Sequence, residues 1–340
     1  METIKKDGFN LVRQADGPDL GYSPTSGVKI IEVDGKAFKS FDGSDTLLPY
    51  EDWRLPMEER AADLASRLSV DEIAGLMLYS IQNKLPMPND TYGGKPFAES
   101  GMKAYDLSDA QIKFLTDDNL RHVLVSTVES PETAARWNNK VQALIEGRTH
   151  GIPANNSSDP RHSAFADAEF SPGSDGSISL WSNMLGLAAT FSPETVEEFG
   201  RIAREEYRAL GLATALSPQA DLGTDPRWYR YSSTFGPEPR LVTDLTRAYA
   251  DGFQTDPTAG GWGNGSVNAM VKHWPGGGSG EGGRDAHYGN GKFAVYPGGC
   301  YEQHKIPFLE GAFKLTGQLG DVMKESAQAG ISYIRSISEE

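Results

Sequence analysis

The sequence predicts an α/β protein of the (β/α)8 TIM-barrel type, incomplete, with about five of the eight βα units readable. From about Arg54 onward, short apolar runs alternate with segments whose apolar residues recur at helical spacing. This alternation is typical of βα units in a parallel sheet. Hydrophobic residues make up 38% of the 340 residues, which is enough for a packed core. Polar clusters follow the apolar runs, where a barrel carries its chemistry.

The first two βα units are predicted between residues 57 and 145. Met57–Ile73 has the apolar spacing of a helix, and the apolar run Ala74–Tyr79 after it predicts a strand. His122–Thr127 predicts a second, buried strand, and Pro131–Ile145 predicts the helix that follows it.

The third unit has its strand and helix far apart in the sequence. We expect the strand to begin at Gly151-Ile152-Pro153 and the helix to span Pro193–Leu210. Ser192 is a favourable cap for this helix, because its hydroxyl can accept a hydrogen bond from the first turn, and proline suits the first helical position. The polar segment Asn155–His162 is expected to be the loop after the strand.

The fourth and fifth units follow more closely on one another. Leu212–Leu222 predicts a strand, the polar segment Asp221–Trp228 its loop, and Pro237–Phe253 the next helix. Val267–Trp274 predicts the fifth strand, and a glycine-rich loop follows it. This loop lacks the Gly-Lys-Ser/Thr ending of a phosphate-binding loop, so we do not expect it to bind nucleotide phosphates.

Three motifs in this order resemble those of a known family. Lys272–Gly278, with Gly283–His287 after it, is similar to the signature loop of glycoside hydrolase family 3. The segment Asp225–Trp228 and the stretch from Gly151–Pro153 to Asp159 resemble two further motifs of that family. Each motif follows a predicted strand, which makes the resemblance specific.

The resemblance covers about Asp52–Phe313 and implies a β-glucosidase-like hydrolase of O-glycosyl bonds at the non-reducing end of its substrate, acting by a retaining mechanism. By position, Asp159 resembles the carboxylate that grips sugar hydroxyls, and Arg227 the guanidinium of the same subsite. Lys272 and His273 resemble the paired donors beside them. The partner implied is a small sugar or β-glucoside.

These residue types suit a hydroxylated ligand, although each has a structural alternative. A carboxylate can accept from two hydroxyls, and an ammonium or guanidinium donates to them. Adjacent residues on a strand point to opposite faces, so Lys272 and His273 can both reach a ligand only if the chain bends. His273 could instead be a core histidine, Asp225 and Arg227 an internal ion pair, and Asp159 part of a turn.

Asp285 and His287 are the candidate acid/base dyad. They resemble the pair that donates the leaving-group proton in the β-N-acetylglucosaminidase branch of the family. That branch has a histidine among the glycines of the loop, where this chain has Gly277. A β-N-acetylglucosaminidase-like hydrolase is therefore one alternative function.

The nucleophile of a retaining mechanism is not found. Such a mechanism needs a carboxylate that forms a covalent glycosyl intermediate, and in the family it is an aspartate usually followed by an aromatic residue. The Asp-Trp pair of this chain, Asp52-Trp53, lies before the first predicted strand, and Asp321 is the sole aspartate after His287. A degenerate, non-catalytic sugar-binding fragment is therefore the other alternative.

We predict an N-terminal extension, residues 1–53, and a truncated family 3 barrel, residues 54–340. The formal net charge of −15 argues against nucleic acid and anionic membranes as partners, because both would repel an acidic surface. An incomplete barrel favours self-association. One cysteine and no visible signal peptide indicate a cytoplasmic protein. We expect no cofactor and no metal.

Overall fold

The computed structural model describes residues 1–82, 86–125, 130–159, 162 and 178–312. The chain forms two compact units, which we call unit 1 (Met1–Asn156) and unit 2 (Ser157–Glu340). Among the described residues, no helix is both long and apolar enough to cross a bilayer.

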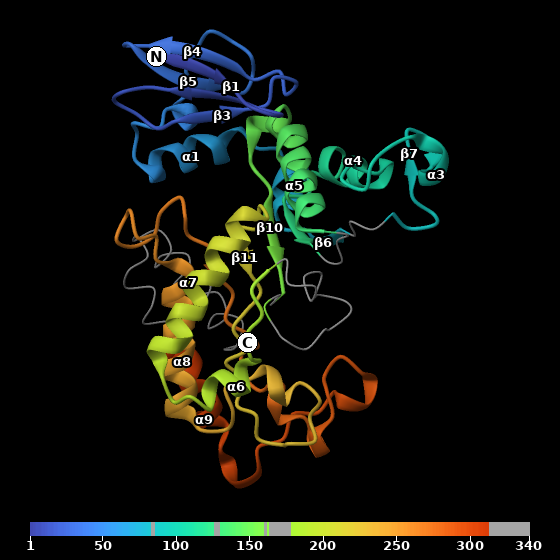
Figure 1. Ribbon diagram of the computed structural model, residues 1–340, viewed down its shortest axis with the longest axis vertical. Coiled ribbons are helices and arrows are strands. Elements are labelled where there is room, and N and C mark those ends of the chain that lie inside the picture. Colours follow the sequence, from blue (N-terminus) through green and yellow to red (C-terminus); the bar gives the residue numbers. More distant parts are fainter. Residues whose placement is uncertain (83–85, 126–129, 160–161, 163–177, 313–340) are drawn as a thin grey trace. The chain divides into compact units, whose positions relative to one another are not determined.

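Unit 1 begins with short antiparallel strands, which the sequence analysis did not predict (Figure 1). The first sheet has the order β1 (Glu2–Lys5), β2 (Asn10–Arg13) and β3 (Leu20–Tyr22). The strands β4 (Lys29–Val33) and β5 (Lys36–Ser40) form a hairpin. Its two-residue turn, Asp34-Gly35, has positive φ at both positions, as a type I′ turn requires.

The rest of unit 1 is mainly helical, with two parallel strands of the central sheet. The strand β6 (Tyr79–Gln82) pairs in parallel with β9 (His122–Val125). The helices are α1 (Met57–Arg67), α2 (Val70–Leu76), α3 (Phe97–Ser100), α4 (Asp109–Thr116) and α5 (Pro131–Glu146), with a small hairpin of β7 (Thr91–Tyr92) and β8 (Lys95–Pro96) before α3.

Unit 2 contains the remaining parallel pairs and two long helices. The strand β10 (Asn155–Ser158), which starts at the end of unit 1, pairs with β11 (Thr214–Ala215), and β11 pairs with β12 (Asn268–Ala269). The full sheet order is β12-β11-β10-β9-β6. The helices are α6 (Met184–Ala188), α7 (Pro193–Ala209), α8 (Pro239–Gln254) and α9 (Tyr301–Ile306), followed by a π-helical turn, Pro307–Ala312.

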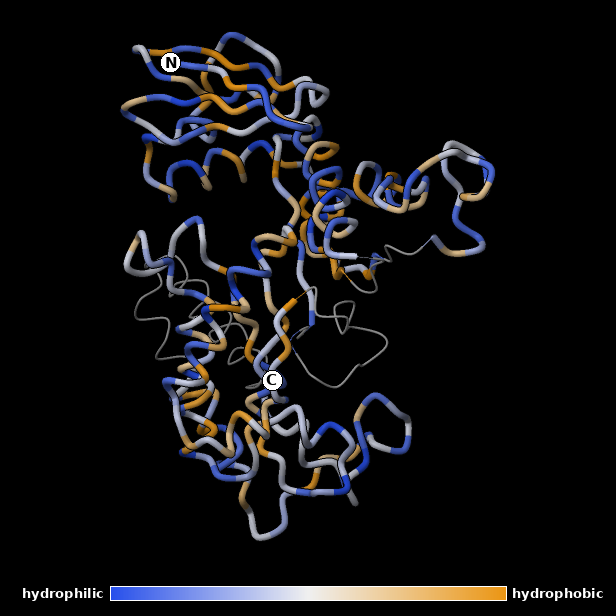
Figure 2. Tube along the Cα trace, in the orientation of Figure 1, coloured by the Kyte–Doolittle hydropathy of each residue, from blue (hydrophilic) through white to orange (hydrophobic). Residues whose placement is uncertain are grey.

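The helices α7 and α8 lie side by side and form the core of unit 2 (Figure 1). Both carry hydrophobic and hydrophilic segments in turn, as amphipathic helices do (Figure 2). Phe199 and Tyr207 of α7 are buried against Phe253 of α8, and Tyr249 stacks on Phe253 with ring centroids 4.7 Å apart.

The predicted fold class is confirmed: the protein is α/β, and its described residues form a parallel sheet of five strands, where a closed barrel has eight. The predicted helices after strands two, three and four correspond to α5, α7 and α8. Serine caps fix two of their starts, because Ser130 accepts from Thr133 N and Ser192 from Thr195 N, both at 3.1 Å.

The predicted strand Ala74–Tyr79 is wrong in its position. Ser69 and Glu72 form a capping box, in which Ser69 N donates to the Glu72 carboxylate at 2.7 Å. This box starts a second helix at Val70 that includes Ala74, so the strand begins only at Tyr79.

The segment Asn155–Ser158, expected to be a loop, is the strand β10 itself. Its residues Asn156, Ser157 and Ser158 are buried, and Asn156 Nδ2 donates to Asn138 Oδ1 at 2.6 Å. Polar side chains can line a buried strand when such partners are present, and apolar patterning does not reveal them.

Candidate functional site

The predicted site residues of unit 2 lie where β10, β11 and β12 end. Asp159 directly follows β10, and its Oδ1 accepts from Lys272 Nζ at 2.6 Å. Lys272 extends the parallel ladder beyond β12, because its N–H donates to Pro218 O at 3.0 Å and its carbonyl accepts from Ala220 N at 2.8 Å. The fold therefore brings together two residues that are more than 100 positions apart in the sequence.

His273 is held by a buried carboxylate. The ring Nδ1 donates to Asp221 Oδ2 at 2.8 Å, and the His273 backbone N–H donates to the same oxygen at 3.1 Å. Gly277 N donates to the other oxygen, Asp221 Oδ1, at 2.9 Å. The peptide bond between Lys272 and His273 is cis. The side chain of Lys272 bonds to the Asp159 carboxylate, and that of His273 bonds to the Asp221 carboxylate.

Asp221 is a candidate site residue that the motifs of the sequence do not identify. It begins the polar segment Asp221–Trp228, which is expected to be the loop after the fourth strand. Its side chain is fully buried, and its two oxygens accept three N–H bonds. The signal in the sequence is an aspartate near the end of the predicted strand Leu212–Leu222, shortly before Gly223. Asp221 is a positioning residue, since it acts through His273 and Gly277.

Asp159 has its own support. Tyr207 Oη donates to the Asp159 carbonyl oxygen at 2.6 Å. Three residues further on, His162 Nε2 and a carboxylate oxygen of Glu206 are 2.6 Å apart. Ser179 N and Oγ also donate to Glu206. The helix α7, which carries Tyr207 and Glu206, therefore anchors the chain on both sides of residues 160–161, which lie outside the described residues.

Asp285 and His287 form a close pair, as the candidate dyad requires. The Nδ1 of His287 lies 2.5 Å from Asp285 Oδ1, and His287 N donates to the same oxygen at 2.9 Å. Trp228 Nε1 donates to Asp285 Oδ2 at 2.5 Å. Burial alone would raise the pKa of Asp285, but these hydrogen bonds together hold it below its usual value. The imidazole is 61% exposed, so the pair has one buried and one accessible member.

Arg227 bonds to Asp225 and not to Asp159, the partner of Lys272. Its guanidinium makes two bonds to Asp225, from Nε to Oδ1 at 3.0 Å and from Nη2 to Oδ2 at 2.6 Å. The side chain is 71% exposed. The hydrogen bonds from Arg227 lower the pKa of Asp225 to about 2. This is the internal ion pair that the sequence left open as an alternative.

Two aspartates of the sequence, Asp52 and Asp321, were compared with the nucleophile of the family. Asp52 lies in unit 1, and its carboxylate accepts two bonds from the Arg54 guanidinium, at 2.9 and 2.7 Å. Asp321 lies outside the described residues.

Comparison with protein families gives two matches. Residues 96–311 match the model of the glycosyl hydrolase family 3 N-terminal domain. Residues 300–340 match the Lon protease (S16) C-terminal proteolytic domain. A stretch of 31 residues is also 77% identical to Lon protease of Lachnoclostridium phytofermentans, over 9% of this chain and 4% of that protein.

Two curated relatives align with most of this chain. A periplasmic β-glucosidase/β-xylosidase of Dickeya chrysanthemi is 40% identical over 295 residues, which are 85% of this chain and 42% of that protein. β-Glucosidase C of Emericella nidulans is 36% identical over 264 residues, which are 78% of this chain and 40% of that protein. The chain therefore spans less than half the length of these relatives.

Solved structures show the same fold. A β-glucosidase from Erythrobacter marinus aligns with a TM-score of 0.52 at 26% identity, over 69% of this chain and 28% of that one. A family 3 β-N-acetylglucosaminidase from Paenibacillus sp. aligns with a TM-score of 0.53 at 19% identity, over 72% of this chain and 40% of that one.

Proposed function

Because the chain belongs to glycosyl hydrolase family 3, we propose that it is part of a β-glucosidase-type hydrolase, which cleaves O-glycosyl bonds at the non-reducing end by a retaining mechanism. In this chain we assign a sugar subsite but no nucleophile. In this proposal Asp159, Lys272 and His273 hold the sugar. The observation that carries it is the Asp159–Lys272 pair at 2.6 Å, next to His273 and its buried partner Asp221. The β-glucosidase names of two relatives support the substrate class.

The pair is chemically suited to bind vicinal hydroxyls. Lys272 Nζ has three N–H donors, and one of them points to Asp159. The carboxylate can accept from two hydroxyls while it keeps this bond. Because the ion pair holds both groups side by side, the binding of a sugar to them needs little rearrangement. His273 donates from Nδ1 to Asp221, so its Nε2 is the atom left for a hydroxyl.

Arg227 has a weaker place in the proposal. To reach a sugar, its guanidinium would have to give up both bonds to Asp225. We therefore expect Arg227→Ala to change sugar affinity less than Lys272→Met.

The test is a titration of the full chain with glucose, followed by calorimetry or ligand-observed NMR. We expect affinity in the millimolar range, about −4 kcal/mol, because the site is partly open to water. Lys272→Met should abolish binding, and Lys113→Met, which changes an exposed lysine of α4, should not. Unchanged binding by Lys272→Met would show that the subsite is wrongly assigned.

The Asp285–His287 pair supports one alternative, a β-N-acetylglucosaminidase-like hydrolase in which this pair is the acid/base dyad. Gly277 counts against it, because a Cβ there would lie 2.7 Å from Asp221 Oδ1. A histidine at this position would displace the carboxylate that holds His273. Binding of N-acetylglucosamine in preference to glucose would favour this alternative, and the reverse would favour the β-glucosidase.

Turnover separates a hydrolase from a non-catalytic sugar-binding fragment. We expect the chain to hydrolyse aryl β-glucosides no faster than buffer, because no nucleophile is assigned. Loss of the nucleophile lowers the turnover rate of such an enzyme by several orders of magnitude. Turnover that survives purification and is abolished by Asp285→Ala would contradict this expectation and make Asp285 a catalytic residue.

The domain limits and the location remain part of the proposal. The family 3 and Lon matches overlap at residues 300–311. There the π-helical turn is bonded to α8, since Arg247 Nη2 donates to Glu310 O at 2.9 Å. We therefore infer that the barrel part of residues 54–340 includes this turn. The predicted cytoplasmic location is kept as a hypothesis beside a relative that is named periplasmic.

A further inference from the structure

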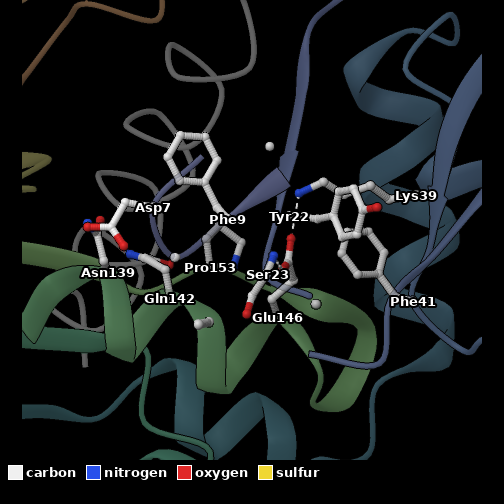
Figure 3. A pocket seen from close by; sticks show the side chains of 14 residues that line it. Asp7, Phe9, Tyr22, Ser23, Lys39, Phe41, Asn139, Gln142, Glu146 and Pro153 are labelled. Carbon is white, nitrogen blue, oxygen red and sulfur yellow. Dashed lines mark hydrogen bonds and ion pairs between the residues drawn. The ribbon is translucent and has the colours of Figure 1, made fainter. Parts of the chain in front are cut away.

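Unit 1 contains a cavity of about 500 Å³ that none of the residues assigned above lines (Figure 3). Its walls come from the N-terminal strands and from α5. The residues that decide its chemistry are Phe9, Tyr22, Lys39, Phe41 and Glu146. A volume of this size is in the range of small-molecule sites, which is about 300–1,000 Å³.

A fixed ion pair supplies the polar groups of the cavity. Lys39 Nζ donates to Glu146 Oε1 at 2.6 Å, and Ser23 N donates to Glu146 Oε2 at 2.8 Å. The two side chains are only 23% and 13% exposed, so the pair is held in place between β5 and α5. Each carboxylate oxygen can accept a second hydrogen bond, and the ammonium has further N–H groups to donate. One hydroxyl could therefore bond to both.

Aromatic rings supply the walls. In Figure 3 the Phe9 ring lies on one side of the cavity, and the Tyr22 and Phe41 rings lie on the other, beside the Lys39 stem. The Phe41 ring is packed on two sides. It lies so close to Gly151 that a Cβ at that position would be 2.0 Å from the ring, and it stacks with the Tyr50 ring. Phe9 is 41% exposed, which leaves an apolar ring face in contact with solvent.

The combination points to a neutral polyhydroxylated ligand. The ionisable side chains of the lining are Asp7, Lys39, Glu146 and Tyr22, which give one positive and two negative charges near neutral pH. This balance disfavours anions. Aromatic faces cover the C–H surface of a pyranose ring, while carboxylate and ammonium groups bond to its hydroxyls. We propose that this cavity is a second carbohydrate site, which binds a neutral saccharide of one or two pyranose rings.

The experiment uses the 15N-labelled full chain and cellobiose as the probe. The Ser23 amide reports on this cavity, because it donates to Glu146, and the Gly277 amide reports on the proposed site in unit 2, because it donates to Asp221. We expect the Ser23 resonance to shift on titration with cellobiose, and to shift equally in the Lys272→Met chain. The two sites are thereby tested separately, because loss of binding at the site in unit 2 does not affect the Ser23 signal. No Ser23 shift up to about 50 mM, well above a millimolar dissociation constant, would overturn the proposal.

Two variants and one control test the residues. Glu146→Gln keeps the shape of the side chain but weakens its hydrogen bonds, because the charge is lost. Phe9→Ala removes one aromatic wall of the cavity. Each substitution should reduce the affinity for cellobiose, measured at the Ser23 amide, at least about fivefold. Phe114→Ala removes another exposed ring of unit 1, which does not line the cavity, and should leave the affinity for cellobiose unchanged. Equal affinity in all three variants would overturn the proposal. So would an equal Ser23 shift with glucose 6-phosphate, because the charge argument would then be wrong.

Discussion

Asp221 shows how one buried carboxylate organises the candidate site. Its oxygens accept from His273 N, His273 Nδ1 and Gly277 N, and its side chain has no contact with solvent. A buried charge is tolerated only when it is fully bonded in this way. The same bonds orient the His273 ring and fix the start of the glycine loop.

We predict that Asp221→Asn lowers the free energy of unfolding by about 2–3 kcal/mol, because an amide group would face N–H donors where an oxygen now accepts. Urea unfolding measures the loss. Asp225→Asn is the control, because the Asp225 carboxylate is 21% exposed and bonds to Arg227, whose side chain is 71% exposed, so its effect should be clearly smaller. Equal effects of the two substitutions would show that the bonds to Asp221 do not organise the loop.

Asp285 predicts a pH dependence of stability. The pKa of its carboxyl is lowered in the folded chain, so the folded state favours the ionised form. The stabilisation is present above the unfolded pKa, which is about 3.9, and is lost as the pH falls through the folded pKa. The difference in urea midpoint between the native chain and Asp285→Asn should therefore be largest near neutral pH and shrink below about pH 4. A constant difference would contradict this.

At the scale of elements, α7 and α8 depend on a close approach of two glycines. A Cβ at Gly252 would lie 2.4 Å from Glu197 O and 2.9 Å from the Gly200 Cα. These are backbone atoms, which cannot rotate away. Only glycine therefore allows the two helices to pack at this distance.

Gly252→Ala should lower the free energy of unfolding by about 1–3 kcal/mol through overpacking, despite the better helix propensity of alanine. Gly261→Ala is the control, because a Cβ there meets nothing within 4 Å. Thermal and urea unfolding of both variants measure the difference. A stabilised Gly252→Ala variant would show that the helices can separate without cost.

At the scale of the whole molecule, the two edges of the parallel sheet are the expected weak points. Among the residues that the structure describes, the sheet order ends at β6 in unit 1 and at β12 in unit 2. Ile81 of β6 is 60% exposed, and Met270, just after β12, is also exposed. In a closed barrel, further strands would cover such edges.

We predict that the chain self-associates and binds a hydrophobic dye, because an open edge with apolar side chains can pair with another chain. Sedimentation velocity over a range of concentrations measures the association. Ile81→Lys places a charge on the edge and should reduce it. A monomer with a sharp thermal transition above about 60 °C would contradict the prediction.

The sequence by itself determined the α/β class, the positions of α5, α7 and α8, and the residues Asp159, Lys272 and His273 as site candidates. These follow from local signals: apolar periodicity, a serine cap before a proline, and short motifs that can be read from consecutive residues. The N-terminal strands were not predicted, because they are short, polar and stabilised by pairing between segments.

Only the tertiary structure decided which side chains meet. Arg227 bonds to its neighbour Asp225 instead of joining Lys272, and Asp221 reaches His273 across 52 positions of sequence. The cavity between the N-terminal strands and α5 has no sequence signal either, since Lys39 and Glu146 are 107 positions apart. Side-chain partners far apart in sequence depend on how the strands and helices pack, and local patterning carries no information on that packing.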